Sequence, residues 1–384
     1  MRSVARICWT VVLLLMAPIP GVAEEVRPAP ERKKLEAETS RDYLRFAFNF
    51  YDQADHGGDP NLDEDVIVLE PQILLGVGLT EDLSVTLKGQ ADIISAASVD
   101  RGHRYAPGAL SGASGDEYFG IEAAAFYAWS DQLKTGAGAS ASMEYDYKSI
   151  GANARVVWDT PDRNDTLVAK VSVYFDTMDV LLFDGTDLGD EERTSWSLGL
   201  GWTHVLGRRT VMTLNYDFTV QDGFLSTPYN SVHIAGTEVQ EILPDSRLRH
   251  AVFGRLRHLW FDDLAVEPGL GLYIDDWGAE AATLELRAFW ECVPGILILQ
   301  PWYRFHAQSE VDQFVSESDA SIPRERTQDS DLASFTSHTL GVKLVAPHVN
   351  LLGVDTELEI GGDGTWRSHG LHSWSVTAGF MIRF

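Results

Sequence analysis

The sequence contains little cysteine and no long apolar run beyond its first residues. Its two cysteines are Cys8 and Cys292. Since Cys8 lies in a segment that we expect to be removed, the mature chain is left without an intrachain disulfide. This argues against a disulfide-stapled secreted scaffold and against a cysteine-based metal site. No later stretch reaches about 18 apolar residues, so the sequence offers no membrane-spanning helix.

Basic residues are also scarce relative to acidic ones. Lys and Arg total 30 against 57 Asp and Glu, for a formal net charge of −27. Because nucleic-acid binding depends on neutralising phosphates with Lys and Arg, this balance argues against a nucleic-acid partner. It is instead typical of acidic surface loops.

Several motifs of enzymes and cofactor-binding proteins are missing. The sequence has no P-loop, no dinucleotide-binding glycine pattern, no His-Glu-x-x-His, no Cys-x-x-Cys and no Gly-x-Ser-x-Gly. We therefore expect no enzyme, no cofactor and no metal centre. One enzymatic alternative stays open, since His250 and His258 fall on the lipid-facing phase of a predicted strand, where a barrel lipase carries its catalytic histidine.

The N-terminus has the pattern of a secretory signal. Arg2 and Arg6 form its basic region, an apolar centre runs over 11–16, and small residues at 21–23 suit a cleavage site. We predict a signal peptide over residues 1–23, a charged periplasmic arm over 24–41 and a β-barrel over 42–384.

The last twelve residues alternate strictly between two kinds of side chain. Trp374, Val376, Ala378, Phe380, Ile382 and Phe384 form one phase, and mostly polar residues form the other. A period of two indicates a strand with one apolar and one polar face. The terminal Phe384 resembles the closing residue of bacterial outer-membrane barrels, which implies an assembly signal read by the barrel-assembly machinery.

The same alternation recurs along the whole chain. Most of the predicted strands have about 10–14 residues, the length that a tilted strand needs to cross a bilayer. The sixteen predicted strands are 43–51, 66–77, 83–94, 118–129, 133–147, 150–158, 165–176, 195–205, 210–220, 250–260, 264–274, 281–291, 296–306, 335–345, 351–360 and 373–384.

The connections between these strands differ in length by parity. The odd-numbered links include all the long ones, namely 52–65, 95–117, 177–194, 221–249 and 307–334. Short periplasmic turns alternating with long extracellular loops are typical of outer-membrane barrels. Trp129, Trp158, Trp260 and Trp290 lie at the short-turn ends, as an interfacial girdle requires. We predict an all-β fold, a closed antiparallel transmembrane β-barrel of about 16 strands, with 14 or 18 as alternatives.

If the apolar phase meets lipid, the other phase lines the lumen. A basic side chain facing lipid at the midplane costs about 2–4 kcal/mol, so the charges belong inside. Either they set a transverse field that orients a solute, or they are salt-bridged neighbours that fill space. The predicted lumen-lining residues are Arg249, Arg255, Arg257, Glu267, Glu285, Arg287, Arg304, Asp355, Glu357 and Glu359.

Two loop properties stay open at this point. The acidic loops near 52–65 and 184–192 are rich in carboxylates that suit Ca²⁺, but their spacing matches no EF-hand. The loop 221–249 holds Gly223, Pro228 and Pro244, which favour a fixed shape. It either folds inward to narrow the bore or forms an external cap.

A set of short motifs resembles a family of bacterial outer-membrane proteins, the domain-of-unknown-function 3570 family. The motifs are Ser-Gly-Ala-Ser at 111–114, Asp-Tyr-Lys-Ser at 146–149, the segments 223–229, 244–249, 273–278 and 301–304, and Ser-Asp-Leu-Ala-Ser-Phe at 330–335. The resemblance implies an outer-membrane barrel and supplies no activity.

These observations lead to one expected function and one alternative of another class. We expect an outer-membrane protein of Gram-negative bacteria, in contact with lipid, that gives porin-like or gated passage to a small polar solute. The alternative is a non-conducting scaffold or accessory barrel that holds a partner protein.

Overall fold

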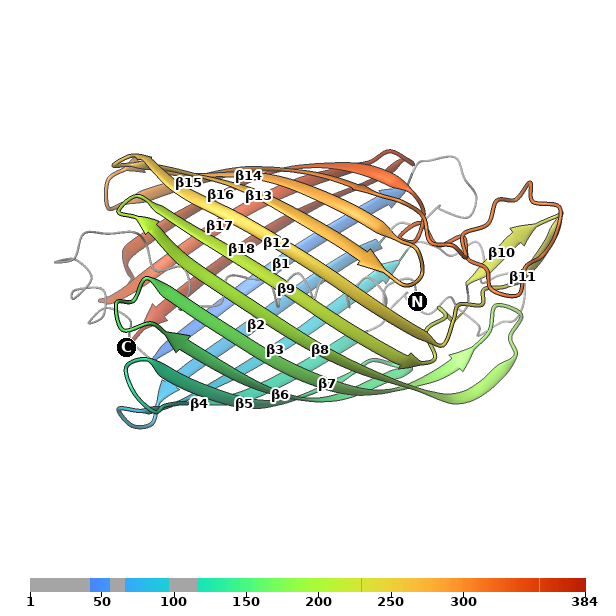
Figure 1. The fold of residues 1–384 in the computed structure, drawn as a ribbon, viewed down its shortest axis with the longest axis horizontal. Helices are drawn as coiled ribbons and strands as arrows, with labels where there is room; N and C mark the ends of the chain where they lie inside the picture. Colours follow the sequence, from blue (N-terminus) through green and yellow to red (C-terminus); the bar gives the residue numbers. More distant parts are fainter. Residues whose placement is uncertain (1–41, 56–65, 97–116, 229, 352) are drawn as a thin grey trace.

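The computed structural model describes residues 42–55, 66–96 and 117–384, apart from 229 and 352. The predicted signal peptide, most of the N-terminal arm and parts of two predicted loops lie outside these residues. Within the described ranges no helix is long and apolar enough to cross a membrane. The regular structure is instead a set of antiparallel strands (Figure 1).

The wall of the molecule contains sixteen strands, and two further strands form a separate hairpin. The wall strands are β1 (Tyr43–Asp55), β2 (Val66–Gly78), β3 (Leu83–Ala96), β4 (Glu117–Ala128), β5 (Leu133–Met143), β6 (Tyr147–Asp159), β7 (Asp165–Leu181), β8 (Asp187–Gly207), β9 (Thr210–Gly223), β12 (Ser246–Phe261), β13 (Leu264–Asp275), β14 (Glu280–Val293), β15 (Leu297–Gln308), β16 (Phe335–Leu351), β17 (Val354–Arg367) and β18 (Leu371–Arg383). The hairpin consists of β10 (Ser231–Ile234) and β11 (Thr237–Gln240).

The sixteen wall strands form a closed antiparallel barrel. Neighbours in sequence are neighbours in the wall, and β9 pairs directly with β12 across the inserted hairpin. The first and last strands close the ring, with Tyr43 opposite Arg383 and Asp55 opposite Leu371. Closure leaves no open sheet edge, which lipid does not tolerate. The predicted fold and strand count are therefore confirmed.

The two faces of the wall differ as the alternation predicts. The outward face exposes large apolar side chains, such as Leu270 and Leu272 on β13 and Leu284 and Leu286 on β14, each about half exposed. Charged residues of the same two strands point inward. Of these, Glu267 on β13 and Glu285 on β14 are only 6% exposed. A soluble protein buries its apolar face, so this inverted pattern is that of a barrel in lipid.

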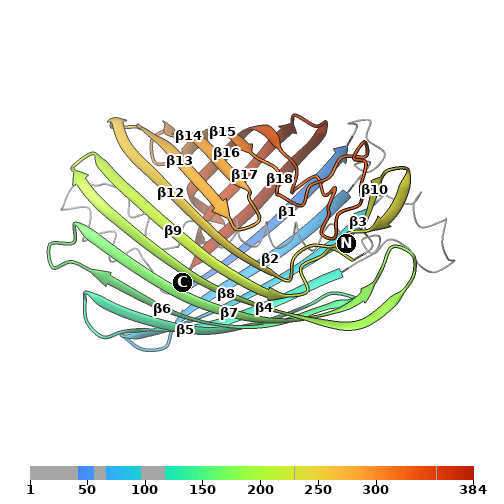
Figure 2. The ribbon, with the colours of Figure 1, turned by 45° about the vertical axis from the view of Figure 1, so that its right-hand side comes forward.

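One end of the barrel carries short turns and the other carries the long connections (Figures 1 and 2). Both the start of β1 and the end of β18 lie at the short-turn end, which is the periplasmic end in an outer-membrane barrel. Trp129, Trp158, Trp260 and Trp290 lie at this end and are 41–65% exposed. They form the aromatic girdle that the sequence indicates.

The structure corrects two predicted boundaries and adds one hairpin. The predicted loop 177–194 is largely strand, because β7 and β8 continue pairing up to Leu181 and Asp187. The predicted strand 133–147 ends at Met143, so Glu144 lies in a turn and not on the barrel wall. The hairpin of β10 and β11 was not predicted.

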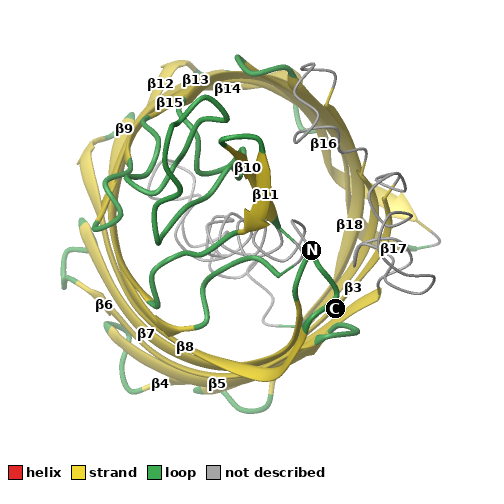
Figure 3. Cartoon of the chain, turned by 90° about the vertical axis from the view of Figure 1, so that its right-hand side faces the viewer, coloured by secondary structure: helices red, strands yellow, loops and turns green. Residues whose placement is uncertain are grey.

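Two loops pack together over the mouth at the loop end. We call this unit the cap, and it comprises residues 224–245 and 309–334. Backbone hydrogen bonds join Ile242 and Arg326, and a parallel bridge joins Phe314 and Thr327. Viewed along the barrel axis, β10 and β11 lie within the outline of the ring (Figure 3), and from the side they lie beyond the ends of most wall strands.

Candidate functional site

Four neighbouring strands, β12 to β15, place a dense group of charged side chains on the inner wall. We call this group the arginine cluster; its members are Arg255, Arg257, Glu267, Glu285, Arg287 and Arg304. They meet because each lies on the inward phase of its strand and the strands are in register, with Glu267 opposite Arg287 and Glu285 opposite Arg304. Four guanidinium groups and two carboxylates leave a formal excess of two positive charges.

Glu285 is the centre of the arginine cluster. Its side chain is 2% exposed, and its carboxylate lies 2.5 Å from Arg304, 3.3 Å from Arg287 and 3.6 Å from Arg255. The contact with Arg304 is a charge-assisted hydrogen bond, donated by Arg304 Nε, and bonds of this kind are among the stronger ones in proteins. A buried carboxylate with three basic neighbours therefore fixes the positions of the arginines around it.

Glu267 also holds two arginines in place, closer to the short-turn end of the barrel. Arg257 Nε lies 2.7 Å from one carboxylate oxygen, and Arg255 Nε lies 3.9 Å from the other. The four arginine side chains keep 25–32% of their surface exposed, whereas both glutamates are at most 8% exposed. The basic groups therefore present the accessible surface of the arginine cluster.

Aromatic rings support the flat faces of the guanidinium groups. Arg257 lies 4.1 Å from the ring centre of Phe289, and Arg255 lies 4.6 Å from that of Phe253. Arg287 and Arg304 both lie 5.7 Å from the ring centre of Trp302. Cation–π contacts hold the planar groups in fixed orientations.

The diametrically opposite wall carries two buried carboxylates. In the ring of sixteen strands, β2 and β3 are eight places from β12 and β13. Leu69 pairs with Ile93 and Gln72 with Gln90, so Glu70 lies opposite Asp92. Both acids are 4% exposed.

Neutral amides donate the hydrogen bonds to Glu70 and Asp92, and the basic side chain of Lys88 on β3 also interacts with both carboxylates. Glu70 accepts hydrogen bonds from the amides of Asn49 and Gln72, and Asp92 accepts one from Gln90. Neither acid forms an ion pair in the part of the chain that the structure describes. At least three residues separate Glu70, Asp92 and every member of the arginine cluster from the nearest strand end. The arginine cluster and this pair of acids therefore lie on opposite walls of the barrel, away from both mouths.

The remaining predicted lumen residues have local roles. Glu357 pairs with Arg383 at 3.0 Å, and Glu359 pairs with Arg45 at 2.6 Å and with Lys343. The charges of Glu357 and Glu359 on β17 are thus compensated by basic residues of neighbouring strands.

Asp355 and Arg249 lie apart from these groups. Asp355 is the second residue of β17 and 59% exposed, and its carboxylate lies 3.2 Å from His348 at the short-turn end. The structure therefore does not place it with Glu357 and Glu359. Arg249 lies on the inward phase six residues before Arg255, opposite Asp275 near the mouth.

The segment 273–278 anchors the mouth of the barrel. Asp275 accepts hydrogen bonds from Arg247, from the Tyr273 hydroxyl and from the backbone of Trp277 and Ala279. Arg247 stacks 4.2 Å from the Trp277 ring centre. Such a fully satisfied carboxylate indicates a structural role for this motif.

The cap is held by a buried carboxylate and two apolar clusters. Glu241 is 2% exposed and accepts hydrogen bonds from the Thr327 hydroxyl at 2.6 Å and from the backbone N–H of Thr227 at 2.9 Å. Val232, Ile234 and Val315 form one apolar cluster. The other contains Leu243, Trp277, Ala279 and Val311, which connects the cap to the barrel.

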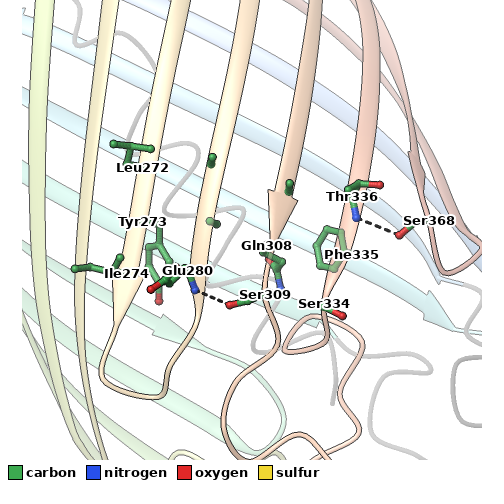
Figure 4. A pocket seen from close by; sticks show the side chains of 13 residues that line it. Leu272, Tyr273, Ile274, Glu280, Gln308, Ser309, Ser334, Phe335, Thr336 and Ser368 are labelled. Carbon is green, nitrogen blue, oxygen red and sulfur yellow. Dashed lines mark hydrogen bonds between the residues drawn. The ribbon is translucent and has the colours of Figure 1, made fainter.

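A pocket of about 720 Å³ lies near the loop-side ends of β13 to β16 (Figure 4). Its lining combines apolar residues such as Leu272, Ile274 and Phe335 with hydroxyl groups of Ser309 and Ser368. Glu280 is its one charged lining residue. This pocket lacks convergent charge, so the arginine cluster is the stronger candidate for binding a polar solute.

The structure gives no support to a metal centre in the residues that it describes, where no group of three or more metal-ligating side chains comes together. Most of the acidic loop 52–65 lies outside those residues. In the second acidic loop, the hydroxyl and amide of Thr186 lower the pKa of Asp184, which is fully exposed. Asp190 and Glu191 belong to β8 and do not converge with it.

Sequence reasoning missed several residues of the site. Trp302, Phe253 and Phe289 share the inward phase of their strands with arginines or glutamates, and aromatic residues in a charged phase were an available signal. Glu70 was also missed, although it interrupts an apolar run in β2. Nothing local signals Glu241, because its partner Thr327 lies 86 residues away.

Comparisons with solved structures find outer-membrane barrels of low sequence identity. OccK1 (OpdK) of Pseudomonas aeruginosa is 9% identical, with 90% of this chain and 98% of that chain covered and a TM-score of 0.43. A bacterial polysaccharide outer membrane secretin is 11% identical, with 90% and 99% covered and a TM-score of 0.49. The siderophore receptor PirA of Acinetobacter baumannii is 11% identical, with 85% and 53% covered and a TM-score of 0.45. No curated protein matches the sequence.

A family model matches residues 106–360, which is more than half of the chain. The family is described as protein of unknown function (DUF3570), in agreement with the motifs at 146–149, 244–249 and 330–335. The closed wall, the outward apolar band and the girdle show a protein of the outer membrane in contact with lipid. The chain is thus an outer-membrane β-barrel that belongs to the DUF3570 family.

Proposed function

We propose that the barrel is a non-catalytic passive channel for small polar solutes, and that the cap narrows its outer mouth. The observation that carries this proposal is the inner wall, where the arginine cluster faces Glu70 and Asp92. A barrel of about sixteen strands is wide enough for an aqueous bore. Charges across such a bore set a transverse field that orients a dipolar solute during passage.

The cap supports restricted rather than free passage. Its two loops are joined by Glu241 and Thr327 and packed around Val232 and Ile234, which are fully buried. A loop region with its own apolar clusters keeps one shape and narrows the opening over which it lies. Seen from the side, its hairpin of β10 and β11 lies beyond the ends of most wall strands (Figure 1), so the loops act as a cap rather than as a plug within the bore.

Conductance of the purified protein in planar lipid bilayers tests this function. We expect discrete conductance steps for the intact chain and larger steps after deletion of residues 226–243, which removes the hairpin of β10 and β11. Replacement of the exposed Ser318 by alanine in the same cap serves as the control and should leave the step size unchanged. Equal steps with and without 226–243 would contradict a narrowing role for the cap.

The absence of any conductance step from both proteins would contradict the channel itself. That result would favour the alternative function, a scaffold barrel whose cap presents a surface to a partner protein. A folded barrel in the same samples, shown by β-rich circular dichroism, keeps this outcome interpretable.

A further inference from the structure

We infer that the arginine cluster is a binding site for the carboxylate group of a small organic anion. This inference names the solute class and rests on the proposed function for the route by which the solute reaches the site. Its basis is the imbalance between hydrogen-bond donors and acceptors within the arginine cluster itself.

The donors of the arginine cluster outnumber its acceptors. Four guanidinium groups offer about twenty N–H donors, whereas two carboxylates offer about eight acceptor positions. Glu267 and Glu285 therefore position the arginines but cannot saturate them. Among the described residues, Arg255 Nε and Arg287 Nε are buried and donate no hydrogen bond, although each lies within 4 Å of a glutamate carboxylate. A further anionic acceptor would complete this set.

The geometry favours a planar anion over a point charge. Phe253 and Phe289 each cover one face of a guanidinium group, of Arg255 and Arg257 respectively, and leave N–H edges of these groups for a ligand. Two parallel N–H bonds from one guanidinium edge match the two oxygens of a carboxylate. Lysine in place of arginine would supply the charge without this match.

The exposure of the side chains points to the bore as the source of the ligand. The arginines are 25–32% exposed, whereas the carboxylates behind them are at most 8% exposed. The anion therefore binds on the β12–β15 side of the bore.

Binding of gluconate to the detergent-solubilised full chain tests the inference directly by calorimetry, with glucose as the neutral probe. We expect gluconate but not glucose to bind. The double variant Arg255→Gln/Arg287→Gln should weaken gluconate binding by about tenfold or more, since each arginine supplies charged hydrogen bonds. Arg45→Gln is the matched control, because Arg45 pairs with Glu359 on another part of the wall, and it should bind gluconate as the parent protein does.

A second variant separates geometry from charge. Arg255→Lys/Arg287→Lys keeps both positive charges and loses the planar edges, so it should also lose most of the affinity. Unchanged gluconate binding in either double variant, or no binding by the parent protein, would overturn the inference. Tighter binding of inorganic phosphate than of gluconate would overturn the assignment to carboxylates.

Conductance distinguishes a failure of this inference from a failure of the proposed channel. Gluconate binding without conductance would support the binding site and contradict the proposed channel. Conductance without gluconate binding would support the channel and contradict the binding site. If both hold, reversal potentials in a KCl gradient should show anion preference that decreases in the Arg255→Gln/Arg287→Gln variant.

Discussion

Trp302 lies across Gly341 of the neighbouring strand, in the space that a side chain on Gly341 would occupy. The glycine thereby allows the indole to lie close to the wall, where Arg287 and Arg304 both contact its ring. The lack of a side chain at Gly341 on β16 thus determines where the Trp302 ring lies, and this ring contacts two arginines of the arginine cluster.

The first prediction concerns this contact. Gly341→Ala places a methyl group within the indole, so Trp302 must move and overpacking should cost about 1–3 kcal/mol of unfolding free energy. Chemical denaturation of the barrel in lipid vesicles measures the loss. Gly254→Ala is the control, since the nearest atom to its added methyl is Leu214 Cδ1 at 3.8 Å, an ordinary contact. Equal stability of the two variants would contradict the close approach.

A second prediction tests which face of the wall meets lipid. Ala139 and Ser140 are consecutive residues of β5, with Ala139 outward and Ser140 inward opposite Glu122. Ala139→Lys should cost about 2–4 kcal/mol in the unfolding free energy, because a lysine near the midplane faces hydrocarbon. Ser140→Lys, which places the same charge in the bore near a carboxylate, should cost much less. The reverse order in vesicle denaturation would mean that the faces are exchanged.

The third prediction concerns the link between the two loops of the cap. Thr327→Val keeps the shape of the side chain but removes the donor to the buried Glu241, at a cost of about 1–3 kcal/mol. We expect faster hydrogen exchange at the amides of Val232 and Ile234, which are buried in the cap, and no change in the wall strands. Ser318→Ala, the control, should leave the exchange rates of the Val232 and Ile234 amides unchanged. Unaltered exchange in Thr327→Val would show that Glu241 does not hold the cap.

The fourth prediction concerns the end of the chain. Phe384 is 65% exposed, and its backbone N–H donates to the carbonyl of Asp42 at the closing seam. If Phe384 is the assembly signal, Phe384→Ala should lower the amount of folded barrel in the outer membrane. Phe261→Ala removes another exposed phenylalanine, at the same end of the barrel, and should have a smaller effect. Similar losses in both variants would point to a general interfacial contribution instead.

Sequence patterning failed where the chain leaves the membrane. The segment 187–194 carries Asp187, Asp190, Glu191 and Glu192, without the apolar alternation that the bilayer imposes on a wall strand. It nevertheless pairs with β7 up to Leu181 because hydrogen bonding of the backbone continues in water. Periodicity therefore located the part of β8 that meets lipid and missed the part that projects beyond it.

The sequence alone determined the barrel, because each strand must place every second side chain against hydrocarbon, and that requirement is local and repeats along the chain. Charge partners were decided only by the tertiary structure. Glu285 meets Arg255, Arg287 and Arg304 because the register of β12 to β15 aligns their inward side chains. The cap likewise joins Glu241 to Thr327, which are far apart in the chain. Such pairings depend on contacts between distant segments, and no local pattern of residues encodes them.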